Sequence, residues 1–409
     1  MTVRMKGFHS LTPVEEAVEL LLSKVKPLGT ETVAIEKALG RVLAQDVSPE
    51  DDIPPFNRAA MDGYAVHGED TFKASETTPV TLKLIGEVTA GASTELVVGE
   101  REAVRISTGA TVPSGANAVV MLEYTQEKGE EVEVLRALPP GKNVSSRGED
   151  AKKGERLLEQ GAVLRPQDIA ILAAMGKCQV EVYKRPSLAV LSSGDELVEP
   201  GMKLAKGEIY DSNSYSLSAL VEMNGGIGEK LGIVRDTPED LKDSLKKISS
   251  YDALLVSGAT SVGGKDLIPA IVEELGEILV HGVSMRPGKP AGFGLIGGKL
   301  VFMLPGSPVA AMFAFDAFVR PAMQKMQGCE IRSPYPKVKG TLKRKIASHL
   351  GRRDFVRVRI DKGGFIEPVS TAGAGVISTM VKAEGFIVVP ENLEGMKEGD
   401  EVEVHLFRI

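Results

Sequence analysis

The chain has 409 residues, and at about 150 residues per domain this length predicts two to four domains. Its 49 Lys and Arg against 56 Asp and Glu leave a net charge of -7, which argues against duplex DNA or an anionic membrane as the main partner of the whole surface. Trp is absent and aromatic residues make up only 5% of the chain, so binding of single-stranded nucleic acid on aromatic stacking platforms is not expected either.

The first predicted element is a helix over residues 13–26, whose apolar side chains recur at helical spacing along one stripe. Thr12 and Glu15 stand at the two positions of a capping box, so we expect Thr12 to begin this helix by accepting a hydrogen bond from the amide of Glu15. The segment up to residue 51 is therefore expected to begin a helical and extended N-terminal domain.

The pattern changes over residues 52–140. Short alternating apolar runs, separated by Gly, Pro and Ser turns, predict a small β domain there. A second predicted helix, over residues 166–175, lies beyond it. We therefore expect residues 1–51 and 141–184 to pack together as one discontinuous domain, with the β domain inserted between its two parts.

Over residues 185–327 predicted strands alternate with predicted helices, which is typical of a mostly parallel α/β sheet covered by helices. The expected strands cover residues 187–191, 231–235 and 253–257, and the expected helices cover residues 214–224, 238–248, 268–275 and 308–326. Two more strands, 293–296 and 299–304, are expected to form a hairpin around a two-glycine turn. Short β runs return over residues 328–409 and predict a C-terminal β-barrel or sandwich.

Four loops of the α/β domain follow its predicted strands, at the edge where open parallel sheets bind their ligands. The first two are rich in small residues, which let backbone amides and hydroxyls approach an oxyanion closely. The third holds two cations that can bind an oxyanion, and the fourth begins a helix, whose N-terminus favours anions. The candidate ligand-binding residues are, loop by loop, Ser193 and Gly194; Gly258, Ser261 and Gly263; Arg286 and Lys289; and Pro305, Gly306, Ser307 and Pro308.

Each loop alone is also explained as an ordinary turn or helix start, but their convergence at one sheet edge favours a ligand site. Known phosphate-binding fingerprints do not match. Residues 282–290 contain Gly-Lys, but the glycines are spaced differently from those of a P-loop, and Pro290 stands where a Ser or Thr would bind magnesium. No Gly-x-Gly-x-x-Gly follows the first strand of the domain. The sequence therefore predicts an anion-binding α/β domain of another type.

Three acidic residues, Glu196, Asp236 and Asp266, lie among the same loops. Carboxylates beside a polyanionic ligand are favourable where a divalent cation lies between them, or where one of them acts as an acid or base. Asp236 and Asp266 also stand where Asp commonly caps a following helix, and the two roles can coexist.

Three segments outside the α/β domain have a distinctive composition: Met61-Asp62-Gly63-Tyr64-Ala65, Thr108-Gly109 and Arg147-Gly148-Glu149-Asp150. With them, in order, stand Ser193-Gly194-Asp195-Glu196-Leu197, Ser261-Val262-Gly263 with Asp266, Arg286-Pro287-Gly288-Lys289-Pro290 and Leu304-Pro305-Gly306-Ser307-Pro308. The chain resembles, over nearly its whole length, the molybdopterin molybdenumtransferase (MoeA) family, which includes the C-terminal domain of gephyrin.

The resemblance implies a homodimer with its active site at the subunit interface. Each subunit would have four domains, with the boundaries 1–51 with 141–184, 52–140, 185–327 and 328–409. The α/β domain, similar to the MogA fold, would hold adenylylated molybdopterin. The implied reaction inserts molybdate or tungstate into that substrate, cleaves its pyrophosphate link with the help of magnesium and releases AMP.

The resemblance also implies the roles of single residues. The implied catalytic residues are Asp62, Asp150, Glu196, Asp236 and Asp266, of which the last three match acidic positions that would hold the metal. Thr108 and Arg147 join the substrate-binding loop residues, and with Asp62 and Asp150 they would act across the dimer interface. Arg286 and Lys289 suit the incoming oxyanion.

Departures from the family pattern leave the fine geometry of the oxyanion site and the choice between molybdenum and tungsten open: Ala259-Thr260, Ser307 and Ala310 replace residues that are usual there. The alternative function is a non-catalytic molybdopterin carrier or a gephyrin-like scaffold. The acidic set favours an enzyme, because a pure anion binder has little use for it. A nucleotide pyrophosphatase built on the same α/β domain is a third possibility, which the near full-length match argues against.

Location and partners follow from simpler features. No apolar run approaches the roughly 18 residues of a membrane span, and the first ten residues lack the apolar stretch of a signal peptide. Cys178 and Cys329 have no metal-binding or disulfide spacing. We expect a cytoplasmic protein without membrane contact, whose partners are a second copy, its small substrates and the enzyme that adenylylates the pterin.

Overall fold

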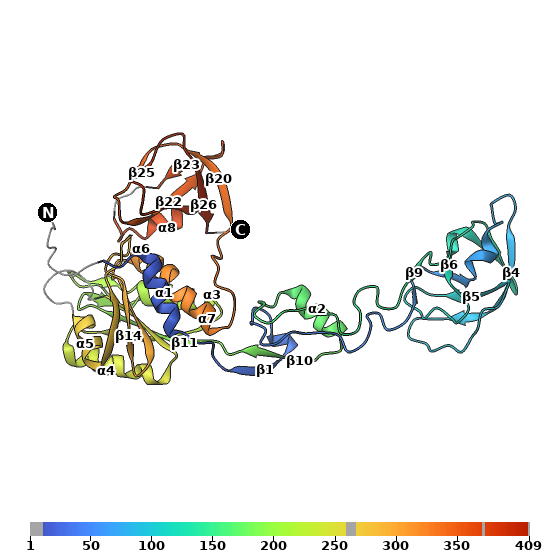
Figure 1. Ribbon diagram of the computed structural model, residues 1–409, viewed down its shortest axis with the longest axis horizontal. Coiled ribbons are helices and arrows are strands. Elements are labelled where there is room, and N and C mark those ends of the chain that lie inside the picture. The colour runs from blue at the N-terminus through green and yellow to red at the C-terminus, as the bar shows by residue number, and fades with distance from the viewer. Residues whose placement is uncertain (1–10, 259–266, 370–372, 408–409) are drawn as a thin grey trace. The chain divides into compact units, whose positions relative to one another are not determined.

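The computed structural model describes residues 11–258, 267–369 and 373–407, which fall into two compact units (Figure 1). Unit 1 comprises Met1–Thr32, Gly40–Ala44 and Glu181–Ile409, and unit 2 comprises Val33–Leu39 and Gln45–Val180. Within the described residues, no helix is long and apolar enough to cross a membrane. The four domain boundaries expected from the sequence remain a prediction within these two units.

Unit 1 contains a six-stranded sheet with the order β14-β11-β15-β19-β18-β16. Its strands are β11 (Ser187–Ser193), β14 (Ile227–Val234), β15 (Ala253–Ser257), β16 (Gly276–His281), β18 (Gly292–Ile296) and β19 (Lys299–Leu304). Strands β14, β11, β15 and β19 are parallel, whereas β18 runs antiparallel to both of its neighbours. The mostly parallel sheet expected from the alternating pattern is therefore confirmed.

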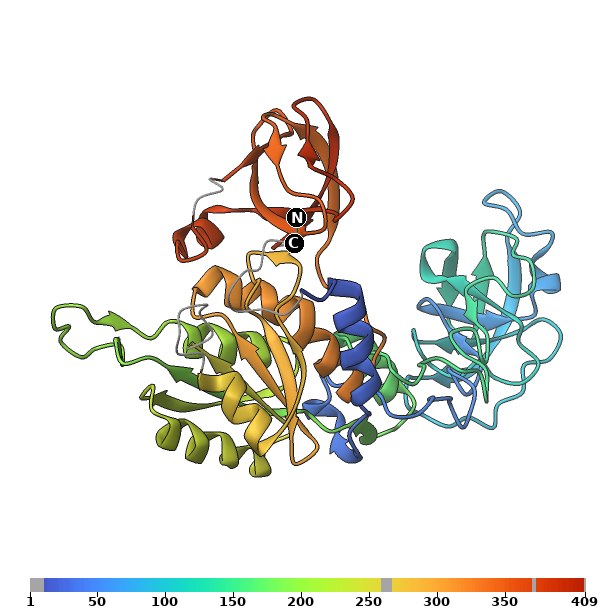
Figure 2. The ribbon, with the colours of Figure 1, turned by 60° about the vertical axis from the view of Figure 1, so that its left-hand side comes forward.

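Helices cover both faces of this sheet (Figure 2). They are α1 (Val14–Lys24), α3 (Asn213–Met223), α4 (Pro238–Lys246), α5 (Leu267–Leu275), α6 (Pro308–Ala314) and α7 (Arg320–Met326), with a π-helical turn over Phe315–Val319 joining the last two and a 3-10 turn over Lys247–Ser250. Neighbouring strand residues alternate between two cores: Leu188 and Val190 pack with α1, α3 and α6, and Ala189 and Leu191 pack with α4 and α5. Burial on both faces explains why these strands read as continuous apolar runs.

The C-terminal part of unit 1 is a closed barrel of five strands, which settles the choice between barrel and sandwich. They are β20 (Lys337–Leu342), β22 (Arg353–Ile360), β23 (Phe365–Pro368), β24 (Gly385–Val389) and β26 (Glu401–Leu406), accompanied by β21 (Ile346–Ala347), β25 (Gly395–Met396) and α8 (Ser378–Lys382). Phe355 and Phe386 pack against Phe313 of α6, with ring centroids 5.1 and 5.3 Å away. Apolar packing thus joins the barrel to the α/β sheet's helices.

Unit 2 contains a second six-stranded sheet, with the order β6-β3-β5-β4-β8-β7. Its strands are β3 (Gly63–Val66), β4 (Val80–Val88), β5 (Glu102–Ile106), β6 (Ala118–Met121), β7 (Thr125–Lys128) and β8 (Glu131–Val134). Shorter elements are β2 (Arg58–Ala59), β9 (Val144–Ser145), α2 (Pro166–Ala174) and 3-10 turns over Ile35–Lys37, Gly68–Thr71 and Leu122–Tyr124. Strands β1 (Thr30–Ala34) and β10 (Gln179–Tyr183) form a separate pair.

The predicted capping box at the first helix is wrong. Pro13 occupies the N-cap position of α1, and no side chain caps the helix. The backbone of Thr12 bonds elsewhere: its amide donates to the carbonyl of Gly282 at 3.1 Å, and its carbonyl accepts from the amide of Ser284 at 2.9 Å. This bridge holds Thr12 in an extended conformation, and a long-range contact of this kind cannot be read from local spacing.

Candidate functional site

The parallel strands bring three predicted loops to one edge of the sheet. Strands β11, β15 and β19 run in register, with Ser192 opposite Ser257 and Ser257 opposite Leu304. The residues that follow, Ser193 and Gly258 among them, therefore leave the sheet side by side. Gly258 has φ +117°, and a Cβ there would overlap the carbonyl oxygen of Ser193, so only glycine fits.

A cavity of about 420 Å³ lies at this edge, and we call it the edge cavity. Eight of the predicted site residues line it: Ser193, Glu196, Asp236, Gly258, Pro305, Gly306, Ser307 and Pro308. Gly194 is next to it in the chain but does not line it, and its amide donates to the carbonyl of Val234 at 3.2 Å. The predicted residues Ser261, Gly263 and Asp266 lie outside the described residues.

Asp236 is one of the carboxylates that line the edge cavity. The Ser193 hydroxyl donates a hydrogen bond to Asp236 Oδ1, which fixes the carboxylate against the end of β11. Helix α4 is capped by Thr237, whose hydroxyl accepts from the amide of Asp240 at 3.3 Å. Because Thr237 performs the capping, Asp236 is left for the cavity, where Glu196 is the second acidic residue of the predicted set.

Asp211 and Asn213 also line the edge cavity, and the sequence reasoning missed both. Asp211 is only 1% exposed, and its Oδ1 accepts from the Ser192 hydroxyl at 2.9 Å and from the amide of Ser214 at 3.1 Å. Asn213 donates to the Ser257 hydroxyl at 2.6 Å and to the carbonyl of Gly306 at 2.8 Å. Through these hydrogen bonds Asp211 contacts the end of β11, and Asn213 contacts the end of β15 and the loop that follows β19. Their place in a polar run before a helix resembles ordinary capping, so no separate signal marked them in the sequence.

The donors fit magnesium in their chemistry. Among the described residues no three His, Cys, Asp or Glu side chains gather closely enough to hold a metal. Glu196 and Asp236 nevertheless line one cavity, and the third predicted carboxylate, Asp266, falls outside the described part of the chain. Magnesium usually binds one or two protein carboxylates and takes its other ligands from water and substrate phosphates, so two carboxylates in one cavity suit it.

A second cavity, of about 350 Å³, adjoins the first, and we call it the cationic cavity. The two share Pro290, Pro305 and Ser307. Its wall combines the loop after β16 with the barrel, because β17 (Met285–Arg286) pairs in parallel with the start of β22 and sets Arg286 opposite Asp354. The predicted loop 285–290 therefore begins as a short strand.

Among the described residues, four with cationic side chains line the cationic cavity: Arg286, Lys289, Arg352 and Arg357. Arg357 is 5% exposed, and burial, together with the nearby positive charge of Arg286, lowers its pKa. Bringing guanidinium groups close together in a partly desolvated site is unfavourable on its own and becomes favourable around an anion. The chemistry of this arrangement therefore suits an oxyanion.

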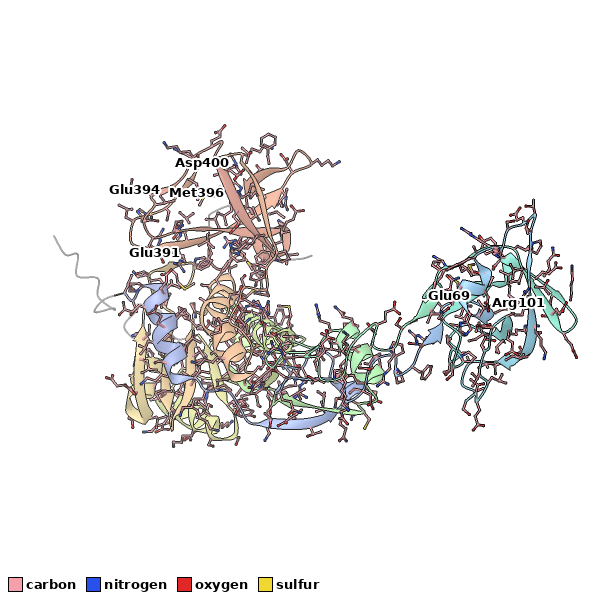
Figure 3. The ribbon with its side chains drawn as sticks, turned by 45° about the vertical axis from the view of Figure 1, so that its right-hand side comes forward. Glu69, Arg101, Glu391, Glu394, Met396 and Asp400 are labelled. Carbon is pink, nitrogen blue, oxygen red and sulfur yellow. The ribbon has the colours of Figure 1, made fainter. Side chains whose placement is uncertain are left out.

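Sequence reasoning found Arg286 and Lys289 but missed Arg352, Asp354 and Arg357, which come from the barrel. The run Arg352-Arg353-Asp354 gave no means of sorting its cations. Arg353, between two cavity residues, turns instead to Glu15 of α1 and to Glu391, whose Oε2 is 3.1 Å from its Nη2. Glu391 lies on the side of the barrel that is near α1 (Figure 3).

The remaining predicted residues belong to unit 2. Asp62 Oδ1 accepts a hydrogen bond from the amide of Thr108 at 2.8 Å, so these two lie together. Arg147 forms an ion pair of 2.6 Å with Asp52, a residue that was not predicted. The hydrogen bond from the amide of Lys153 and, after it, this ion pair lower the pKa of Asp52. The amide of Asp150 donates to the carbonyl of Ile53 at 3.0 Å.

The geometry defines a class of protein: a multidomain α/β protein with two adjoining cavities, lined by charged and polar side chains, at the carboxyl ends of its parallel strands and against the attached barrel. Three family models cover most of the chain: the MoeA N-terminal region (domain I and II) matches residues 12–176, a probable molybdopterin binding domain matches 189–325 and the MoeA C-terminal region (domain IV) matches 339–407. The chain belongs to the MoeA family.

Individual relatives agree with this assignment. A molybdopterin molybdenumtransferase of Staphylococcus aureus is 32% identical and is covered to 95%, with 96% of this chain aligned. One of Haemophilus influenzae is 33% identical, with 93% of this chain and 95% of the relative aligned. A crystal structure of a molybdopterin biosynthesis MoeA protein from Pyrococcus horikoshii matches with a TM-score of 0.84 at 40% identity, covering 98% of this chain and 100% of that one.

Proposed function

We propose that this protein is a molybdopterin molybdenumtransferase of molybdenum cofactor biosynthesis. It inserts molybdate into adenylylated molybdopterin and releases AMP. The named transferases of S. aureus and H. influenzae support the activity, and the match to a molybdopterin binding domain supports the substrate. Tungstate, nearly equal to molybdate in size and charge, is proposed as a second oxyanion. We place the enzyme in the cytoplasm, supplied by the enzyme that adenylylates the pterin.

The observation that carries this proposal is the adjacency of two cavities of opposite character. The edge cavity offers carboxylates and small residues, the cationic cavity offers guanidinium and ammonium groups, and Pro290, Pro305 and Ser307 line both. A transferase must hold its oxyanion next to its second substrate, and adjacent subsites supply that proximity. A pure carrier of one anion has no need of the second cavity.

The cationic cavity is proposed to bind the oxyanion. Arg286, Lys289 and Arg357 would donate charge-assisted hydrogen bonds to its oxygens, and Ser307 would add a hydroxyl at the junction of the cavities. Burial and, after it, the repulsion by Arg286 lower the pKa of Arg357, and a bound dianion would offset that repulsion.

The edge cavity is proposed to bind the pterin nucleotide and magnesium. Ser193, Gly258 and Gly306 let the ligand approach the strand ends closely, and Glu196 and Asp236, with Asp266, would hold the metal through carboxylate oxygens. Bound magnesium would offset negative charge on the pyrophosphate link. The chain's own part is to position that link, with Asp236 fixed by the Ser193 hydroxyl.

Asp62, Thr108, Arg147 and Asp150 are proposed to complete the site of a second copy in a homodimer. Two contacts support a binding role: the amide of Thr108 holds the Asp62 carboxylate, and Asp52 holds the Arg147 guanidinium. Both side chains are thereby oriented before a ligand arrives, which lowers the entropy lost on binding.

The test is release of AMP from adenylyl-molybdopterin with magnesium, with and without molybdate or tungstate. The wild type should release AMP in an oxyanion-dependent way, and Asp62→Ala and Glu196→Ala should lose most of that release. Asp243→Ala, an exposed carboxylate on α4, is the matched control and should behave as wild type. Tight binding of the pterin without turnover under either oxyanion would contradict the transferase and leave a carrier.

A further inference from the structure

One carboxylate lies within the cationic cavity. Among the described residues that line it, Asp354 alone is acidic, and its side chain is only 4% exposed. Both of its oxygens are taken up by Arg352: Nε donates to Oδ1 at 2.6 Å and Nη2 donates to Oδ2 at 2.9 Å. Arg286 adds an ion pair, with Nη1 3.9 Å from Oδ2.

The bidentate pair decides what the cavity can offer a ligand. An ionised carboxylate is the strongest hydrogen-bond acceptor a protein has, and it has no donor. Both oxygens of Asp354 accept from the Arg352 fork and its side chain is only 4% exposed, so little of that acceptor is turned to a ligand, which meets mainly the cations Arg286, Lys289 and Arg357. The Ser307 hydroxyl can donate or accept, but it is a weaker, uncharged acceptor.

We propose that the Arg352–Asp354 pair determines specificity by excluding protonated oxyanions, above all inorganic phosphate. This rests on the proposed function, in that it takes the cationic cavity as the site of the oxyanion substrate. Molybdate, tungstate and sulfate carry no proton at neutral pH and can accept at every oxygen. Phosphate keeps at least one proton, which needs an acceptor in the site. Burying that proton without a partner should cost phosphate roughly tenfold to a hundredfold in affinity.

Phosphate is tetrahedral and anionic, like molybdate, so charge and shape alone cannot exclude it. Specificity then needs an element that disfavours the wrong ligand as well as contacts that favour the right one. The Arg352–Asp354 pair is that element. The pairing of β17 with β22 places its carboxylate in the cavity wall, because it sets Asp354 opposite Arg286.

The test is direct binding of oxyanions to the full chain without pterin, by isothermal titration calorimetry with molybdate, sulfate and phosphate at constant ionic strength. The key variant is Arg352→Lys, which keeps the charge but cannot hold both carboxylate oxygens at once. It should reduce the preference for molybdate and for sulfate over phosphate by about tenfold. Arg353→Lys is the matched control, since Arg353 pairs with Glu15 and Glu391 and does not line the cavity.

The double variant Arg352→Lys with Asp354→Asn separates the acceptor from other effects. If the freed carboxylate accepts the phosphate proton, the phosphate affinity gained by Arg352→Lys should disappear when Asp354 is replaced as well. Circular dichroism and the Tm of every variant check the fold. A gain that survives in the double variant, or an unchanged preference in Arg352→Lys, would overturn the proposal, as would a wild type that binds phosphate as tightly as molybdate.

These outcomes also separate this inference from the proposed function. A wild type that binds molybdate in a cavity indifferent to Arg352→Lys would refute the specificity role and leave the transferase standing. A wild type that binds none of the three oxyanions, alone or with adenylyl-molybdopterin present, would contradict the oxyanion site itself.

Discussion

The edge cavity and the cationic cavity differ in how they are built. The edge cavity is built around the ends of adjacent parallel strands, where Ser193, Ser257 and Gly258 line it, so the register of one sheet assembles much of it. The cationic cavity joins a loop of the α/β sheet to a barrel strand almost 70 residues further along the chain, through a two-residue strand pair. Binding chemistry near strand ends follows from the fold, whereas the charge cluster depends on how two domains dock.

The largest effect is expected from the edge cavity. Glu196→Gln removes a carboxylate charge at the proposed magnesium site, so we expect the maximal rate of AMP release to fall by about a hundredfold to a thousandfold. Oxyanion affinity should change little, because the cationic cavity is intact. The rate is measured at saturating adenylyl-molybdopterin over a range of magnesium concentrations. An equal loss of oxyanion binding would show that the two cavities do not act separately.

In the cationic cavity, Arg357→Gln removes a buried guanidinium that Arg286 repels. Oxyanion affinity should fall by about a hundredfold, since charge-assisted hydrogen bonds are lost in a desolvated site. The Tm should fall only slightly, because the free-energy penalty of burying that charge is removed at the same time. Calorimetric titration with molybdate and a thermal melt measure the two effects. Arg359→Gln, on the same strand but with its Nε donating to the carbonyl of Lys382, is the control.

A smaller effect tests the framework of the edge cavity. Gly258→Ala places a Cβ against the carbonyl oxygen of Ser193 at φ +117° and should destabilise unit 1 by about 3 kcal/mol. Gly207→Ala is the control, since φ there is +96° but no atom of the described residues lies within 4 Å of a Cβ placed there. It should lower the free energy of unfolding by only about 1 kcal/mol. Urea unfolding followed by circular dichroism measures both. Equal losses would mean that close packing of the strand ends is unimportant.

The smallest effect concerns the barrel that carries half of the cationic cavity. Burial, and after it Lys337, lowers the pKa of His405, which stacks on Phe386 with centroids 4.9 Å apart. His405 then binds a proton at about pH 6.5 in the unfolded chain, but only at lower pH in the folded barrel. Stability should therefore fall as pH drops from 7.5 to 5.5, by at most about 1.4 kcal/mol per pH unit. His405→Gln should reduce this slope in Tm measured against pH, and an unchanged slope would exclude His405 as its source.

The sequence predicted the edge cavity well because parallel strands obey a simple rule. Ser193 ends one strand, Gly258 and Pro305 follow the next two, and the ends of neighbouring parallel strands meet at one edge. The residues it missed fail for identifiable reasons. Asp211 and Asn213 stand in a run that resembles helix capping. Arg352 and Arg357 belong to the cavity only because β22 pairs with β17, and a two-residue pairing leaves no periodic signal.

The wrong capping box has the same cause. Local spacing suited Thr12 for a cap, but a backbone bridge to residues 282–284 is worth two hydrogen bonds and holds Thr12 extended. The alternation of predicted strands and helices therefore predicted the layers of the α/β domain and its strand ends. Where the prediction was wrong or incomplete, contacts between distant segments of the chain were the reason.

One measurement tests most directly whether the edge cavity and the cationic cavity have separate roles. It is the rate of AMP release against molybdate concentration for the wild type, Glu196→Gln and Arg357→Gln. This separation of roles predicts that Arg357→Gln moves the curve to higher molybdate with nearly the same plateau, and that Glu196→Gln lowers the plateau without moving the curve. Release that is independent of molybdate in the wild type, or the same change of curve in both variants, would contradict it.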